Sequence, residues 1–167
     1  MTRHRPLLPS LIVSIVFWAP ASSQTPAVPP SAAPLLAVGD TVPPFDGERL
    51  DGVSERVDYP KGSATVLLFF LGSCPSCHKM IPEWNLVYAR RPKGLRVVGV
   101  LLDREPPGFF MATPISFPVV RSPGGDFSKT FKLHKVPLTV RVAAGGKVQD
   151  VGVGQLDPIR LGEIFRP

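Results

Sequence analysis

The chain has 167 residues, of which 44% are hydrophobic and 19% are charged, and its formal net charge is +6. This length and apolar content fit one globular domain with an appendage and exclude a disordered polypeptide. The basic residues are scattered among acidic ones without a basic run, so the charge indicates a solvated surface and no nucleic-acid partner.

The first segment has the three-part pattern of a secretory signal peptide. Two arginines near the start precede an apolar stretch from Leu7 to Trp18, and residues 19–24 are small and polar. The stretch is shorter than the roughly 20 residues that span a bilayer. We therefore expect residues 1–23 to be cleaved and the mature protein to be periplasmic or otherwise exported, without a stable membrane span. Anchoring by an uncleaved signal is the alternative.

The next segment, residues 24–37, is rich in Pro and Ala and has no periodicity. This composition predicts an extended, semi-rigid linker. Residues 38–167 contain no second linker and no internal repeat, so they are predicted to form one domain of ordinary size. We expect this domain to be a monomer.

Two near-continuous apolar runs, at residues 64–71 and 95–102, predict central strands that are buried on both faces of a sheet. Residues 75–91 between them predict a helix that Pro82 bends. The strand, helix, strand order implies a parallel crossover and an α/β fold. The helix positions expected to face the core are Met80, Ile81, Trp84, Leu86, Val87 and Tyr88.

The second half of the domain predicts shorter elements. Residues 126–133 predict a helix, whereas the proline-rich segment 106–114 predicts either a short helix or a loop. A β-hairpin is predicted over residues 138–153, turning at Gly145-Gly146. Asp157-Pro158 has the residue types of a helix N-cap and first helical position, and predicts a short terminal helix.

The only two cysteines of the chain, Cys74 and Cys77, stand three positions apart. A disulfide that encloses so few residues constrains the unfolded chain very little, so a redox role is favoured over a structural one. Cys74 would lie at the helix start, where unpaired N–H groups and the helix dipole stabilise a thiolate. We predict that Cys74 is the nucleophile and that Cys77 resolves the mixed disulfide.

The two residues between the cysteines are Pro75 and Ser76. Proline fits the first helical turn, where its missing N–H costs nothing, and it stiffens the small ring that forms on oxidation. Both residues occupy positions that help to set the redox potential of such a pair, so they are predicted to support the site.

Taken together, these motifs resemble the thioredoxin-like superfamily, and within it the exported TlpA/ResA type of the redoxin, or AhpC/TSA-like, group, over residues 38–167. The motifs that carry the resemblance are Val38-Gly39-Asp40-Thr41-Val42-Pro43-Pro44-Phe45, Val66-Leu67-Leu68-Phe69-Phe70, Cys74-Pro75-Ser76-Cys77, Pro82, Val136-Pro137 and Gly145-Gly146-Lys147-Val148.

The resemblance implies a thioredoxin-like fold, in which helices flank a central mixed β-sheet and a strand extension precedes it. It implies a thiol-disulfide oxidoreductase that acts on exported protein thiols or disulfides without a cofactor, recharged by a redox partner that the sequence does not identify. It also implies that Pro137 is cis and lies against the cysteine pair, and that the backbone of Val136 pairs with the substrate chain.

Several positions depart from the family pattern. The aromatic residue that usually precedes the first cysteine is Ser73, and Leu138 replaces the usual Thr after the proline. The acid that some cytochrome-maturation members carry is replaced by Met80, and the buried strand acid of thioredoxin is replaced by Leu68. The proton acceptor for the resolving thiol is therefore unassigned.

Three other functions share parts of this pattern. Cys74 to His78 spell the C-x-x-C-H motif of c-type haem attachment, in which His78 would be an axial ligand. Two thiols and His134 could hold a copper ion in a thioredoxin-like module. A thiol peroxidase would share the fold, but Leu67 and Leu71 replace the proline and threonine of peroxiredoxins. The sequence favours the oxidoreductase and predicts no bound metal.

Overall fold

The computed structural model describes residues 36–124 and 126–167. The predicted signal peptide and residues 24–35 of the predicted linker lie outside the described residues. Among the helices of the described part, none has the length and apolarity that a membrane crossing requires.

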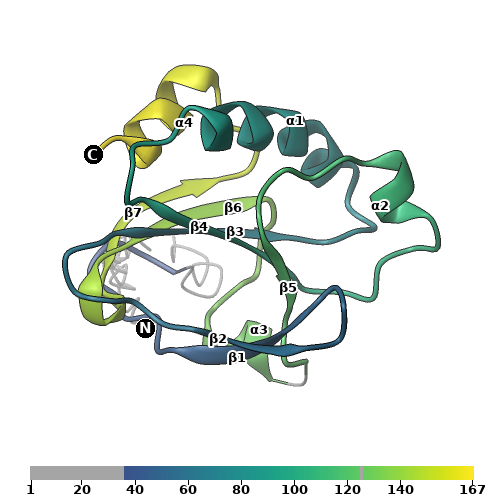
Figure 1. Cartoon of the computed structure of the whole chain (residues 1–167), viewed down its shortest axis with the longest axis horizontal. Coiled ribbons are helices and arrows are strands. Elements are labelled where there is room, and N and C mark those ends of the chain that lie inside the picture. Colours follow the sequence, from purple (N-terminus) through teal and green to yellow (C-terminus); the bar gives the residue numbers. More distant parts are fainter. Residues whose placement is uncertain (1–35, 125) are drawn as a thin grey trace, which may run out of the picture. The chain divides into compact units, whose positions relative to one another are not determined.

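Seven strands, four α-helices and one 3-10 helix follow one another along the described chain (Figure 1). They are β1 (Phe45–Arg49), β2 (Ser54–Val57), β3 (Thr65–Phe70), α1 (Pro75–Ala89), β4 (Arg96–Leu101), α2 (Phe109–Ala112), β5 (Val119–Arg121), α3 (Phe127–Thr130), β6 (Leu138–Val142), η1 (Ala144–Gly146), β7 (Val148–Val153) and α4 (Pro158–Phe165).

The strands form one mixed sheet in the order β2-β1-β5-β4-β3-β6-β7. β4 runs parallel to both of its neighbours, β3 and β5, while the pairs at either side are antiparallel. β1 and β2 form the predicted strand extension ahead of the first central strand. The α/β class and the central mixed sheet are therefore confirmed.

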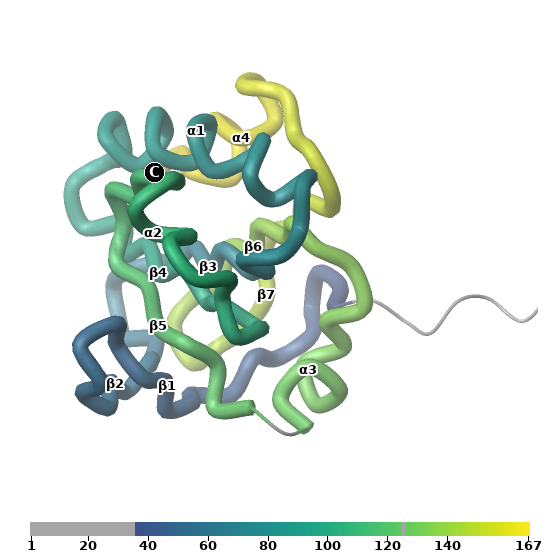
Figure 2. The backbone as a smooth tube through the Cα atoms, turned by 90° about the vertical axis from the view of Figure 1, so that its right-hand side faces the viewer, coloured from purple at the N-terminus to yellow at the C-terminus, as the bar shows by residue number. Residues whose placement is uncertain are grey.

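β3 is buried along its whole length because it packs against a separate apolar cluster on each face of the sheet. Val66, Leu68 and Phe70 join the cluster that contains α1 and α4 side chains. Leu67 and Phe69 alternate with them and join the cluster that contains β1, β2 and α3 side chains. Figure 2 shows α1 and α4 on one side of the sheet and α3 on the other.

The predicted core face of α1 is partly wrong. Met80, Ile81 and Trp84 are buried as expected, together with Cys77. Leu86, in contrast, is 51% exposed. A helix turns about 100° per residue, so a position two residues beyond Trp84 lies on the opposite side of the helix. Pro82 lies within the helix, as predicted.

The helix predicted over residues 126–133 is shorter than expected. α3 covers only Phe127–Thr130, and Lys132 after it has a φ of 55°. A left-handed residue cannot continue a right-handed α-helix, so the helix ends before it. The ambiguous segment 106–114 contains the four-residue helix α2.

The predicted hairpin is β6 and β7, paired antiparallel around η1.

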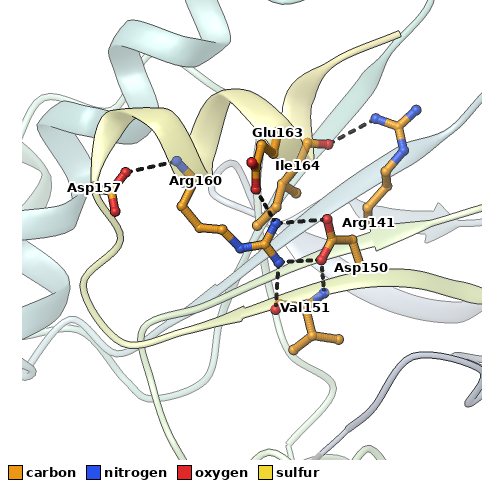
Figure 3. Close-up of polar contacts among 7 residues, drawn as sticks. All are labelled: Arg141, Asp150, Val151, Asp157, Arg160, Glu163 and Ile164. Carbon is orange, nitrogen blue, oxygen red and sulfur yellow. Dashed lines mark hydrogen bonds and ion pairs between the residues drawn. The ribbon is translucent and has the colours of Figure 1, made fainter.

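α4 begins as predicted: Asp157 caps it by accepting a hydrogen bond from Arg160 N at 2.9 Å. The Arg160 guanidinium then pairs with Asp150 on β7 and with Glu163 on its own helix (Figure 3). Arg141 on β6 donates to the Ile164 carbonyl, so ionic and backbone contacts fasten α4 to this edge of the sheet.

Candidate active site

The cysteine motif follows the carboxyl end of β3, at a point where the ends of three strands meet. Register pairs place Phe70 beside Leu101, the last residue of β4, and Phe69 beside Leu138, the first residue of β6. The loops that follow β3 and β4 and the loop that precedes β6 therefore emerge at one end of the sheet. Open α/β sheets bind their ligands at this end.

Cys74 is the N-cap of α1, and Pro75 is its first helical residue. The Cys74 sulfur accepts a hydrogen bond from the Cys77 backbone N–H at 3.2 Å, so it takes the place that an N-cap oxygen usually occupies. Ser76 Oγ lies 3.0 Å from the same sulfur. Cys74 is partly exposed.

Cys77 lies one helical turn further on and has no exposed surface. Its thiol donates to the Cys74 sulfur across 2.6 Å. Burial, followed by the hydrogen bond to Cys74, raises the pKa of Cys77 to about 12, because a thiolate in this cluster would lose its hydration. Cys77 is therefore protonated at neutral pH and serves as a hydrogen-bond donor.

Cys74 shows the opposite shift. Partial burial opposes its ionisation, but hydrogen bonds from Cys77 and Ser76 outweigh that effect and hold the pKa of Cys74 below its ordinary value. The thiolate is the reactive form of cysteine. The two sulfurs therefore differ in both access and ionisation, and only Cys74 combines exposure with a stabilised negative charge.

Gly72, two residues before Cys74, is held from both sides. Its N–H donates to Asp103 Oδ1 at 2.7 Å, and its carbonyl oxygen lies 2.7 Å from His78 Nε2. Asp103 also accepts from the Ser73 N–H at 3.1 Å and from Ser73 Oγ at 2.7 Å. The Asp103 carboxylate thus fixes the two residues that lead into Cys74.

The sequence interpretation missed Asp103. The signal was available, because Asp103 is the first charged residue after the apolar run 95–102 and follows a central parallel strand. Polar residues at that end of such strands form sites. The contact between His78 and Gly72 could not be read in the same way, since it depends on the path of the loop.

The peptide bond between Val136 and Pro137 is cis, as the family resemblance implied. It directly precedes β6, so it emerges at the same end of the sheet as the cysteine motif. The side chains of Val136 and Cys74 pack against the same buried cluster. The structure therefore brings the predicted proline loop and the cysteine pair to one region.

The other chemistries fit this geometry less well. Haem attachment would require thioether bonds to both cysteines and a free His78 ring, but Cys77 is fully buried and His78 Nε2 contacts a carbonyl oxygen. His134 is exposed, and no cluster of three or more potential metal ligands occurs within the described residues. Leu67, which stands where a peroxidase has proline, is buried in the core.

An open cavity of about 820 Å³ lies beside this site. It is lined mainly by residues 101–111, including Asp103, and by Arg121, which forms an ion pair with Glu105 at 2.6 Å. Neither cysteine lines it. The cavity therefore gives solvent access to the Asp103 side of the loop and not to the sulfurs.

A thioredoxin-like fold with a vicinal cysteine pair at the start of its first long helix defines a thiol-disulfide oxidoreductase. More particularly, the chain belongs to the AhpC/TSA family, whose sequence profile matches residues 38–151.

Individual relatives carry corresponding names. Sporulation thiol-disulfide oxidoreductase A of Bacillus subtilis is 22% identical over 92% of this chain and 91% of its own length. Thiol-disulfide oxidoreductase ResA of Oceanobacillus iheyensis is 27% identical over 76% of this chain and 70% of its own.

Solved structures are similar in fold. StoA from Bacillus subtilis aligns with a TM-score of 0.63 and 23% identity, covering 75% of this chain and 98% of its own. A thiol:disulfide interchange protein of the thioredoxin family from Chlorobium tepidum aligns with a TM-score of 0.62 and 24% identity, covering 77% and 95%.

Proposed function

We propose that the protein exchanges electrons between its Cys74–Cys77 pair and exported protein substrates through a mixed-disulfide intermediate. The observation that carries this proposal is the unequal placement of the two sulfurs: Cys74 is partly exposed at the N-cap of α1, and Cys77 is fully buried one turn further on. The same surroundings lower the pKa of Cys74 and raise that of Cys77. This difference suits Cys74 to attack a substrate and Cys77 to resolve the mixed disulfide that forms.

In the reducing direction, the Cys74 thiolate attacks one sulfur of a substrate disulfide. A Cys74–substrate disulfide forms, and the other substrate sulfur leaves as a thiolate. Cys77 then loses its proton and attacks the Cys74 sulfur, and the second substrate thiolate, which leaves, can take up that proton. The enzyme pair is oxidised by two electrons and the substrate disulfide is reduced by two. In the oxidising direction the same steps run in reverse.

The substrate chain is proposed to lie along the Val136–Pro137 loop, with the Val136 backbone paired to it. This loop precedes β6 at the end of the sheet where the cysteines lie. A backbone contact would accept many sequences, because it recognises an extended chain and not its side chains. Protein substrates that differ around their cysteines are therefore expected.

The proposed location is the periplasm or another exported compartment, reached through cleavage of a signal peptide at residues 1–23. Cell fractionation of the full chain, with the molecular mass of the recovered protein, tests this point. A mature species that lacks about 20 residues is expected in the soluble exported fraction. Full-length protein in the membrane fraction would instead support the uncleaved anchor.

Two variants test the mechanism. Cys77→Ser cannot resolve a mixed disulfide, so it is expected to accumulate substrates joined to Cys74. The matched Cys74→Ser variant is expected to accumulate none. Disulfide-linked species would be counted on non-reducing gels of the exported fraction. Equal yields from the two variants would contradict the assignment of the nucleophile.

The reduction potential and the visible spectrum of the purified exported form complete the test. A reversible two-electron couple without a haem band is the expected result, and the potential assigns the protein to reduction or oxidation of its substrates. A covalent haem spectrum with no titratable thiols would make the protein a cytochrome.

A further inference from the structure

The cavity beside the cysteine site has an apolar wall that the exchange between the two sulfurs does not use. This wall, here called the α2 wall, is the segment from Pro106 to Met111, which enters the helix α2. Phe109 is buried in it, Phe110 is half-buried, and Met111 is 91% exposed. Methionine adapts to ligands of different shape and is frequent on surfaces that accept many partners. The α2 wall therefore has the composition of a surface that binds apolar side chains.

Two contacts join the α2 wall to the segments on either side of Cys74. A Cβ placed on Gly72 would lie 3.2 Å from Pro106 Cδ, so the wall packs against the residue two positions before Cys74. The ring centroids of His78 and Phe109 are 5.4 Å apart, which joins the wall to the first turn of α1. Two residues of chain span at most about 7 Å, so the wall begins close to the reactive sulfur.

The charged groups that line the cavity are largely matched within the protein. Arg121 pairs with Glu105 at 2.6 Å and lies 3.5 Å from Glu48. Asp103 accepts hydrogen bonds from two backbone N–H groups and one hydroxyl. Arg104 is exposed, so water hydrates it. An ionic ligand would have to compete with these contacts, whereas a neutral apolar group would leave them intact. The cavity therefore favours an uncharged, apolar occupant.

The position of the cavity indicates which part of a substrate would enter it. Neither cysteine lines the cavity, so its occupant is a part of the substrate other than the reacting sulfur. Its volume of about 820 Å³ lies within the range of ligand-binding sites. An extended chain advances about 3.3 Å per residue. In a substrate joined to Cys74, a side chain about two to four residues from the substrate cysteine is therefore within reach of the α2 wall.

We propose that this cavity is a specificity site: it binds an apolar side chain of the protein substrate, two to four residues from the cysteine that reacts with Cys74, against the α2 wall. The proposal rests on the proposed function and adds a side-chain preference to the backbone pairing at Val136. A substrate with an apolar residue at this distance is held at the site before Cys74 attacks. It therefore forms the mixed disulfide faster when substrate is dilute.

The test uses short peptides in which the single cysteine carries thionitrobenzoate as a mixed disulfide. Cys74 attacks the peptide sulfur, a Cys74–peptide disulfide forms, and thionitrobenzoate leaves as a coloured ion. The purified Cys77→Ser protein is used, because it cannot resolve the product. Each peptide has a Gly-Ser background, in which one Phe is moved through the four positions on each side of the cysteine.

The expected result is a preference that depends on position. Phe at two to four residues on one side of the cysteine should raise the second-order rate constant about three- to tenfold over the Gly-Ser peptide. Asp at the same position should give no increase. Adding Met111→Ser or Phe110→Ala to the protein should reduce the Phe advantage at least about twofold. Met111 is so exposed that its replacement leaves the fold intact.

Two controls separate substrate binding from the chemistry of the thiol. Leu86→Ser also removes an exposed apolar side chain, but near the other end of α1, and is expected to keep the full Phe advantage. The small reagent 5,5′-dithiobis(2-nitrobenzoate) has no flanking residues. Its rate of reaction with Cys74 is therefore expected to be the same with and without Met111→Ser.

Each outcome decides one question. If neither the small reagent nor any peptide releases thionitrobenzoate, the proposed function itself fails. If all of them react and the position of Phe makes no difference, only the specificity site is overturned. A Phe advantage that survives both Met111→Ser and Phe110→Ala would come from another surface and would also overturn it. Loss of the advantage with an unchanged small-reagent rate supports the site.

Discussion

The raised pKa of Cys77 makes a quantitative prediction about stability at alkaline pH. The folded chain keeps a proton on this thiol that the unfolded chain releases above its ordinary pKa of 9.0. Above pH 9 the unfolded state therefore binds fewer protons than the folded state, and the free energy of unfolding falls as pH rises. The effect is absent below pH 8 and grows until the folded thiol ionises near pH 12.

The magnitude follows from the ionisation of the unfolded thiol. At pH 10 that thiol is about 90% ionised while the folded one is still neutral, so unfolding becomes easier by roughly 1 to 2 kcal/mol relative to low pH. A smaller shift of the folded pKa would change this value little, as long as the folded thiol stays neutral at pH 10.

The assay compares Cys74→Ser with the double variant Cys74→Ser/Cys77→Ala. Neither can form the disulfide, and burial, which is the largest cause of the Cys77 shift, is retained in the first. Urea unfolding at pH 8 and pH 10 gives the stability difference between the two proteins at each pH. Contributions from other titrating groups cancel when the two proteins are compared at one pH. The pH-independent cost of the missing sulfur cancels when the stability difference at pH 8 is subtracted from that at pH 10.

We expect the stability advantage of Cys74→Ser over the double variant to shrink by roughly 1 to 2 kcal/mol between pH 8 and pH 10. No measurable change would mean that Cys77 ionises in the folded state almost as readily as in water. The assignment of Cys77 as the proton-holding partner would then be refuted, along with the asymmetry on which the proposed mechanism depends.

Three further substitutions test the site and its support. Ser76→Ala removes the 3.0 Å contact to the Cys74 sulfur and should raise the pKa of Cys74, slowing its alkylation by iodoacetamide at pH 7 by roughly two- to fivefold. Trp84→Phe leaves the buried Thr139 hydroxyl without its 3.0 Å partner and should lower the free energy of urea unfolding by about 1–3 kcal/mol. Gly72→Ala adds a Cβ about 3.0 Å from Glu105 Cβ, so the surrounding atoms must shift by a few tenths of an ångström. It should cost about 1–3 kcal/mol in the same assay and slow the attack of Cys74 on 5,5′-dithiobis(2-nitrobenzoate). Wild-type values would contradict the contacts in each case.

Much of the fold can be predicted from the sequence because it depends on local patterns. The uninterrupted apolar runs predict β3 and β4, since only a strand covered on both faces buries every side chain. The Asp157-Pro158 pair predicts the start of α4, because capping and a fixed φ are properties of adjacent residues. The position of Cys74 at a helix start follows from the same kind of reasoning.

Predictions fail where a residue's surroundings come from distant segments. Apolar character placed Leu86 in the core, but it lies about 200° around α1 from the buried Trp84 and faces solvent, so only one of the two could be buried. Which side of α1 packs against the sheet is decided by the tertiary arrangement. The helix predicted over residues 126–133 stops early because Lys132 adopts a left-handed conformation after α3.

The sequence alone predicted the reacting groups: a cysteine pair with the spacing of one helical turn, following a strand that must be buried. The tertiary structure alone decided how these groups differ, by burying Cys77, leaving Cys74 partly exposed and bringing Asp103, which follows β4, to hold the loop that leads into Cys74. The physical reason is that spacing is a property of the chain, whereas ionisation depends on solvent and charge around each sulfur. Those surroundings exist only after distant segments have packed together.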